Sequence, residues 1–82
     1  MSQTEVFEKV VQVLSPYVKN QTALARLSGD THILDDLKVN SARFVDVVLA
    51  LEDEFGIAVA DEEMDSVTTV GDAVSLICSK LS

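Results

Sequence analysis

The side chains most often used in catalysis are scarce in this chain of 82 residues. His32 is the single histidine and Cys78 the single cysteine. A zinc site takes about four ligands, mainly histidine and cysteine, so the sequence predicts no metal site. Cys78 lies among apolar residues near the C-terminus, which favours a buried, inert thiol over a nucleophile. A single cysteine also excludes an internal disulfide and fits a reducing compartment.

Carboxylates are abundant, since 14 acidic residues face 6 basic ones and give a formal net charge of −8. A pair of hydrolytic carboxylates needs an enclosed cleft, for which a domain of this size has little room. No EF-hand loop is present. We therefore expect no catalytic residue. The negative field would repel nucleic acid and steer basic proteins.

Ser41 is the remaining candidate, because it begins a segment with helical apolar spacing. From position alone the common use of such a serine is an N-cap, whose loss costs roughly 0.5–2 kcal/mol. A cap and a reactive hydroxyl are compatible roles in an unmodified protein. Position by itself favours the cap.

Helical periodicity predicts the elements that would position Ser41. A first helix is expected to begin with Thr4 as its cap and to end near Leu14, because Pro16 removes a hydrogen-bond donor. A long connection follows, approximately over residues 19–40, with a helical turn near 22–27. Its expected apolar anchors are Leu24, Leu27, Ile33, Leu34 and Leu37.

A second helix is predicted from Ser41 to Phe55, with Gly56 as the terminating residue. Its apolar stripe is expected to hold Ala42, Phe44, Val45, Val47, Val48, Leu51 and Phe55. A short acidic helix over 61–65 follows. A last helix, capped by Thr69 and Asp72, is expected to face inward with Val70, Ala73, Val74, Ile77 and Leu81.

The fold prediction is therefore all-α: a small bundle of three main helices plus one short helix, with a long loop between the first two main helices. Residues 1–82 are expected to form a single domain. No apolar run approaches the ~20 residues that span a bilayer, and no secretory signal is visible. The sequence therefore predicts a cytoplasmic protein, and we expect a monomer.

The stretch over residues 33–74 resembles the acyl carrier protein family. It reads ILDDLKVNSARFVDVVLALEDEFGIAVADEEMDSVTTVGDAV. The similarity includes Asp36-Leu37, the serine four residues after Leu37, the acidic run before Gly56 and the Thr-Thr-Val at 68–70. The spacing is kept without a gap, and the predicted helix order fits the whole chain.

This resemblance implies that Ser41 carries a covalent 4′-phosphopantetheine arm, attached by a phosphopantetheinyl transferase. A helix N-terminus suits the phosphate, since free N–H groups and the helix dipole favour a negative group there. The protein would then carry acyl groups as thioesters for fatty acid, polyketide or related lipid biosynthesis. It would act as a carrier for separate enzymes and would not itself be an enzyme.

The resemblance also implies docking of basic patches on acyl-loading and acyl-using enzymes. The expected partner-binding residues are Asp46, Glu52, Asp53, Glu54, Asp61, Glu62 and Glu63. The alternative is a solvated acidic face that keeps the domain soluble. An acyl pocket between the helices would use Phe44, Val45, Val48 and Leu51. For Phe44, plain core packing is the competing interpretation.

Three residues depart from the family pattern around Ser41. The family usually shows Asp-Ser-Leu, whereas this chain has Asn40-Ser41-Ala42, and Arg43 adds a positive charge. These changes favour a specialised carrier, a selective transferase or a carrier that is never modified. Two other functions stay open: an acidic helical adaptor without an arm, and a carrier that loads an amino acid or another acid.

Overall fold

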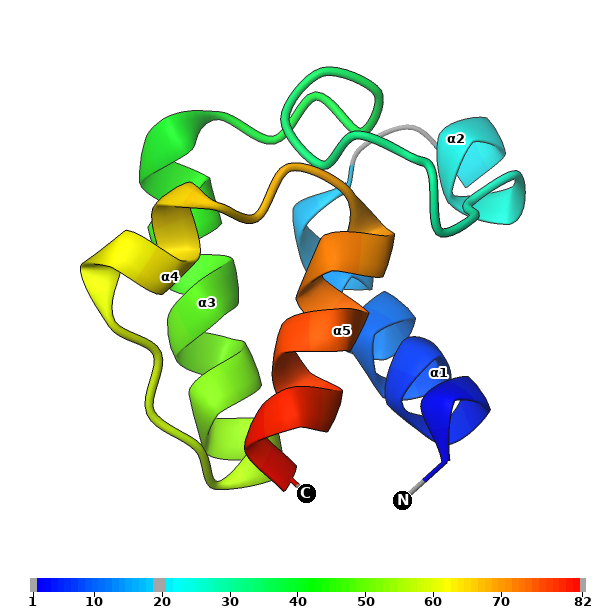
Figure 1. Ribbon diagram of the computed structural model, residues 1–82. Helices are drawn as coiled ribbons and strands as arrows, with labels where there is room; N and C mark the ends of the chain where they lie inside the picture. Colours follow the sequence, from blue (N-terminus) through cyan, green and yellow to red (C-terminus); the bar gives the residue numbers. More distant parts are fainter. Residues whose placement is uncertain (1, 19–20, 82) are drawn as a thin grey trace.

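The computed structural model describes residues 2–18 and 21–81, and Figure 1 shows their arrangement. Lys19 and Asn20, at the start of the predicted connection, lie outside the described residues. The elements in chain order are α1 (Gln3–Leu14), the 3₁₀ turn η1 (Ser15–Tyr17), α2 (Gln21–Ala25), α3 (Ser41–Phe55), α4 (Asp61–Asp65) and α5 (Val70–Leu81). The long helices α1, α3 and α5 form the bundle, with α4 beside α3. The predicted all-α fold is confirmed.

The cap of the first helix lies two residues earlier than predicted, at Ser2. Ser2 Oγ accepts a hydrogen bond from Glu5 N–H, and Glu5 Oε1 accepts one from Ser2 N–H, both at 3.2 Å. These bonds form a capping box, so the prediction of Thr4 as the cap was wrong. They lower the pKa of the Glu5 carboxyl. The predicted end at Leu14 is confirmed, because Pro16 turns the chain into η1.

The core is one apolar cluster to which every long helix contributes. Its buried members are Val6, Val10, Leu14, Val18, Ile33, Leu37, Val39, Phe44, Val47, Val48, Leu51, Val70, Ala73, Val74 and Ile77. On α3 the exposed positions include Ala42 and Val45, which had been predicted to share the inward stripe. Leu81 was also expected inside but is 39 % exposed, and the last buried residue of α5 is Ile77.

The long connection is held by buried side chains along its second half. Ile33 and Leu37 are buried as predicted, and Val39 is buried as well. Leu24 and Leu27, from and just after α2, are half-buried against the same core. Leu34 is not an anchor, since it is 41 % exposed.

A set of backbone hydrogen bonds ties the connection to the start of α5. Ile33 N–H donates to Thr68 O (3.0 Å), Val70 N–H to Thr31 O (2.9 Å) and Gly71 N–H to Gly29 O (2.8 Å). A Cβ at Gly71 would lie 2.7 Å from Gly29 O, so this approach requires glycine. We call residues 29–33 and 68–71, joined in this way, the loop clasp.

The predicted cap of α5 is confirmed and adjoins the loop clasp. Asp72 Oδ2 accepts hydrogen bonds from Thr69 N–H and Thr68 N–H, both at 3.1 Å, and Thr69 Oγ1 accepts one from Asp72 N–H. The bonds from Thr69 and Thr68 lower the pKa of the Asp72 carboxyl.

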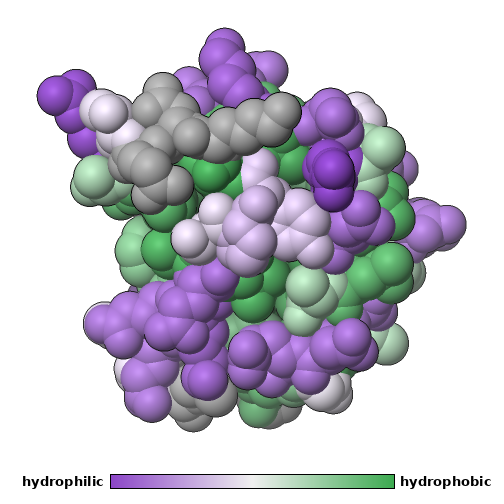
Figure 2. All heavy atoms as spheres, turned by 180° about the vertical axis from the view of Figure 1, so that it is seen from behind, coloured by the Kyte–Doolittle hydropathy of each residue, from purple (hydrophilic) through white to green (hydrophobic). Residues whose placement is uncertain are grey.

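Hydrophilic and hydrophobic side chains are mixed on the face shown in Figure 2, which is opposite to the view of Figure 1. None of the helices within residues 2–18 and 21–81 is long and apolar enough to cross a membrane.

Candidate functional site

Ser41 is the first residue of α3, and it is exposed. The cap of this helix is Asn40, whose Oδ1 accepts a hydrogen bond from Arg43 N–H at 2.8 Å. The interpretation of Ser41 as an N-cap was therefore wrong by one position. Among the described residues no side-chain hydrogen bond engages the Ser41 hydroxyl. The hydroxyl stands at the helix N-terminus with no structural task there.

An apolar hollow of ≈ 260 Å³ opens beside Ser41, which we call the Ser41 hollow. Apart from Asp65, the other residues that line it are apolar. Together with Ser41 they are Leu34, Phe44, Val45, Met64, Asp65 and Val67. Its walls come from the long connection, from α3, from α4, and from Val67, two residues after α4. A group attached to Ser41 would find an apolar surface next to its point of attachment.

A second, smaller cavity lies between α3, α4 and α5. It offers only ≈ 20 Å³ to the centre of a water-sized sphere, which is about the space of one water molecule. Its lining is apolar: Ile33, Phe44, Val48, Leu51, Val59, Met64, Val67, Ala73, Leu76 and Ile77. Phe44, Met64 and Val67 line both spaces. These three side chains therefore separate the Ser41 hollow from the inner cavity.

The four predicted pocket residues fall on different sides of this wall. Val48 and Leu51 line the inner cavity, and Phe44 belongs to the wall itself. Val45, 44 % exposed, lines the outer hollow instead. Sequence reasoning did not name Met64, although a methionine inside the acidic run 61–65 is the kind of flexible apolar residue that borders adaptable cavities.

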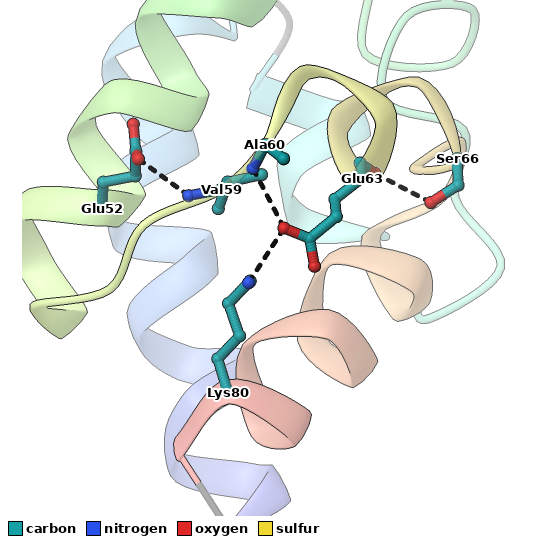
Figure 3. A network of polar contacts seen from close by, with 6 residues as sticks. All are labelled: Glu52, Val59, Ala60, Glu63, Ser66 and Lys80. Carbon is teal, nitrogen blue, oxygen red and sulfur yellow. Dashed lines mark hydrogen bonds and ion pairs between the residues drawn. The ribbon is translucent and has the colours of Figure 1, made fainter.

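The seven predicted partner-binding acids divide into two groups, and the first group holds the fold. Figure 3 shows Glu52 Oε2 accepting a hydrogen bond from Val59 N–H at 2.9 Å. It also shows Glu63 Oε1 accepting one from Ala60 N–H (3.0 Å) and pairing with Lys80 Nζ (2.9 Å). The bond from Ala60, and then that from Lys80, lowers the pKa of the Glu63 carboxyl.

Glu54 belongs to the same group, since its Oε2 lies 3.6 Å from Lys9 Nζ on α1. The Glu54 and Lys9 side chains are both well exposed, so this ion pair contributes little to stability. The acidic end of α3 thus has a partly structural explanation. Glu52 fastens the segment after the helix, and Glu54 reaches the neighbouring helix.

The second group is open to solvent. Asp46, Asp53, Asp61 and Glu62 are exposed, and none of them makes an ion pair within the part of the chain that the structure describes. Their charges are free for another molecule. The same described residues contain no cluster of histidine, cysteine and carboxylate groups that could hold a metal ion.

Comparisons with known proteins agree with this arrangement. The family described as phosphopantetheine attachment site matches residues 10–77. The acyl carrier protein of Petrotoga mobilis is 35% identical over 82 residues, which cover 100% of this chain and 94% of the relative. That of Thermotoga maritima is 36% identical over 80 residues, covering 98% and 96%. A solved structure of the acyl carrier protein from Enterococcus faecalis matches with a TM-score of 0.80 and 35% identity, over 98% of this chain and 99% of that one.

The chain belongs to the acyl carrier protein family. Members of this family are carriers without enzymatic activity of their own, and they bear a covalent 4′-phosphopantetheine. This arm supplies a flexible thiol that holds the acyl cargo for separate enzymes. The chemistry of this chain fits the group, because an exposed, uncommitted hydroxyl stands at the N-terminus of α3 beside an apolar hollow.

Proposed function

We propose that Ser41 is the residue that receives the phosphopantetheine arm. The observation that supports this most is the cap of α3: Asn40 satisfies the Arg43 N–H, so the neighbouring Ser41 hydroxyl is left free and exposed. The phosphate would lie against the open N–H groups of the first helical turn. The chain would then function as one domain, residues 1–82, around its single apolar cluster.

Intact-mass measurement of the protein isolated from its native host tests this site. We expect one phosphopantetheine adduct, lost in Ser41→Ala and kept in Ser75→Ala. Ser75 is a matched control, since it is also an exposed serine on a main helix. An adduct that persists in Ser41→Ala, or a wild-type protein that is uniformly bare, would contradict the proposal. Recovery with the cargo attached would also identify the acid that is carried.

The cargo is proposed to start in the Ser41 hollow and to reach the inner cavity past Phe44. The inner cavity has room for about one water in this closed form, so an acyl chain must push α3 and α5 apart to enter. Phe44 would set how easily the wall opens. Comparison of acyl-chain-length preference between wild type and Phe44→Ala tests this role. An unchanged preference in a folded variant would leave Phe44 as a core residue only.

The acidic residues on and after α3 are proposed to dock basic patches of partner enzymes. Within the seven residues, the four exposed and unpaired acids Asp46, Asp53, Asp61 and Glu62 would contribute most, because their charges are not already engaged. Such docking weakens as salt rises. If the kcat/KM of a partner enzyme for this carrier does not change with ionic strength, docking through these acids is contradicted.

The pathway is proposed from the family and from composition. We infer service in fatty acid, polyketide or related lipid biosynthesis, by a monomer in the cytoplasm. The partners would be a phosphopantetheinyl transferase and enzymes that load or use the acyl group. An amino acid as cargo would use the same arm, and the mass of the recovered cargo distinguishes the two.

A further inference from the structure

A second hollow, of ≈ 460 Å³, lies on another side of the start of α3, toward η1. Six residues line it: Pro16, Tyr17, Lys38, Val39, Asn40 and Arg43. We call it the cationic hollow. Ser41 does not line it, and the two hollows share no residue.

Each polar side chain among the lining residues of the cationic hollow offers a hydrogen-bond donor. Lys38 and Arg43 carry ammonium and guanidinium N–H groups, and Tyr17 carries a hydroxyl. Asn40 uses its Oδ1 as the helix cap, which leaves its NH₂ group to donate. No carboxylate is part of the lining. A surface of this composition suits an anion.

The two cations of this hollow are not neutralised inside the described part of the chain. Lys9 pairs with Glu54 and Lys80 pairs with Glu63, whereas Lys38 and Arg43 have no ion-pair partner among the described residues. In a protein of net charge −8, their charges are thus kept apart from the abundant acids. Their charges are therefore available to an external anion.

The backbone at Lys38 fixes its side chain at this surface. Its neighbours Leu37 and Val39 are both buried, at 1 % and 3 % exposure, while Lys38 is exposed. Lys38 has φ 57°, in the left-handed region that a lysine rarely adopts. Such a conformation costs roughly 1–3 kcal/mol and persists only where the surroundings impose it. The two buried neighbours impose it here, so Lys38 is presented to solvent beside Asn40.

The anion is more readily supplied by another protein than by the arm itself. Ser41 lines the apolar hollow and not the cationic one, so a group attached to Ser41 would begin at the apolar hollow. An enzyme that uses the cargo meets it at the far end of a flexible arm. The transferase, in contrast, must bring its active site to the Ser41 hydroxyl. Lys38, Asn40 and Arg43 lie within three residues of Ser41 and so fall inside its contact area.

We propose that the cationic hollow binds a carboxylate side chain of the phosphopantetheinyl transferase that modifies this chain. This inference rests on the proposed attachment at Ser41. The transferase would present an acidic residue opposite Lys38 and Arg43 and basic residues opposite the exposed acids Asp61 and Glu62. Two contacts of opposite sign fix the rotation of the carrier about Ser41. A transferase surface that is basic throughout would be repelled at the hollow, which gives selectivity.

Arm transfer from coenzyme A to the apo-protein by the transferase of the native host tests the proposal. The test variant is Lys38→Asn with Arg43→Gln, where asparagine tolerates the left-handed backbone at position 38. The control is Arg26→Glu, an exposed position that lines neither hollow. Both variants change the formal charge by −2, since two cations are neutralised in one and a single cation is reversed in the other.

We expect kcat/KM to fall about tenfold in the double variant and less than about twofold in the control, at low salt. The difference should shrink as salt rises. Zero-length carbodiimide cross-linking should also join Lys38 to an Asp or Glu of the transferase. Circular dichroism establishes that both variants fold.

Equal rates in the two variants would overturn the proposal, and so would a cross-link map without Lys38. A change in the ³¹P signal of the arm-bearing variant, with an unchanged transfer rate, would show instead that the arm's own phosphate occupies the hollow. If the wild-type protein accepts no arm at all, the attachment at Ser41 fails first. The two failures are thus distinguishable.

Discussion

The Ser41 hollow and the cationic hollow flank the start of the same helix and differ in chemistry. The first is lined by Leu34, Phe44, Val45 and their apolar neighbours, with Asp65 as its charged residue. The second is lined in part by side chains with hydrogen-bond donors, among them Lys38 and Arg43. Only the first continues, through a shared wall, toward a space inside the protein.

This difference indicates a division of labour around one hydroxyl. An apolar hollow suits the carrier's own cargo, because burial of apolar surface needs no specific partner. A cationic hollow suits a partner that approaches from outside, because charge pairs set orientation and association rate more than affinity. Variants that alter one hollow and leave the other unchanged test whether the two hollows act separately.

The free energy of unfolding should respond most strongly to a change in the wall between the Ser41 hollow and the inner cavity. Phe44→Ala removes a buried side chain from the wall and should lower the free energy of unfolding by about 3 kcal/mol. Val45→Ala is the neighbouring control. Since Val45 is 44 % exposed, its loss should cost less than about 1 kcal/mol. Urea unfolding of both variants measures the difference, and equal losses would show that the wall is not part of the core.

A smaller effect is expected at the loop clasp, which supports the connection that supplies residues to both hollows. Gly71→Ala places a Cβ 2.7 Å from Gly29 O, a backbone atom that cannot move alone. Alanine also gains about 1 kcal/mol of helix propensity in α5, so the clash must exceed this gain to be visible. We expect a net loss of about 1 kcal/mol or more by urea unfolding.

Gly29→Ala is the matched control for the clasp. A Cβ at Gly29 would meet nothing closer than Gly71 Cα at 3.9 Å, an ordinary contact. Its stability should stay within about 0.5 kcal/mol of wild type. A Gly71→Ala protein as stable as this control would mean that the clasp can open without loss.

The smallest effect is the pH dependence of the α5 cap. The pKa of Asp72 is lowered in the folded protein, so its ionised form stabilises the fold above the ordinary value of 3.8. This contribution is lost as pH falls through the lowered pKa. Asp72→Asn should therefore reduce the thermal midpoint at neutral pH, and the difference from wild type should vanish in acid. A difference that stays constant with pH would contradict the charged cap.

Much of this architecture could be predicted from the sequence, because strong local signals agree with the packing. The end of α1 follows from Pro16, the end of α3 from Gly56 and the start of α5 from the Thr69–Asp72 pair. In each case one residue type controls the backbone within a few positions. The exception is the predicted cap of α1 at Thr4. This prediction was wrong because Ser2 and Glu5 form a complete capping box, with the cap two residues earlier.

The site was predicted less completely, because its features depend on contacts between distant residues. Ser41 could be read as a cap until the structure placed Asn40 Oδ1 on Arg43 N–H. Leu34 is an apolar residue of the kind that anchors a loop in the core. It lies at the Ser41 hollow instead, because the loop clasp fixes how the connection turns. Periodicity does not report such long-range hydrogen bonds.

The two roles of the acidic residues could be distinguished only in the structure. In sequence, Glu52, Asp53 and Glu54 are one acidic run. In space, Glu52 fastens Val59 and Glu54 meets Lys9, while Asp53 remains free. A charge count treats the three alike, although only a residue without an internal partner offers its full charge to another protein.

The position of the arm is the most direct test of the whole account. Apo-protein would be incubated with coenzyme A and a transferase, digested, and its peptides fragmented in the mass spectrometer. We predict a single phosphopantetheine on Ser41. Two results would contradict the claim that the Ser41 hydroxyl at the start of α3 is the attachment site. One is an arm on another serine, such as Ser28 or Ser66. The other is a protein that stays bare with a transferase that modifies other carriers.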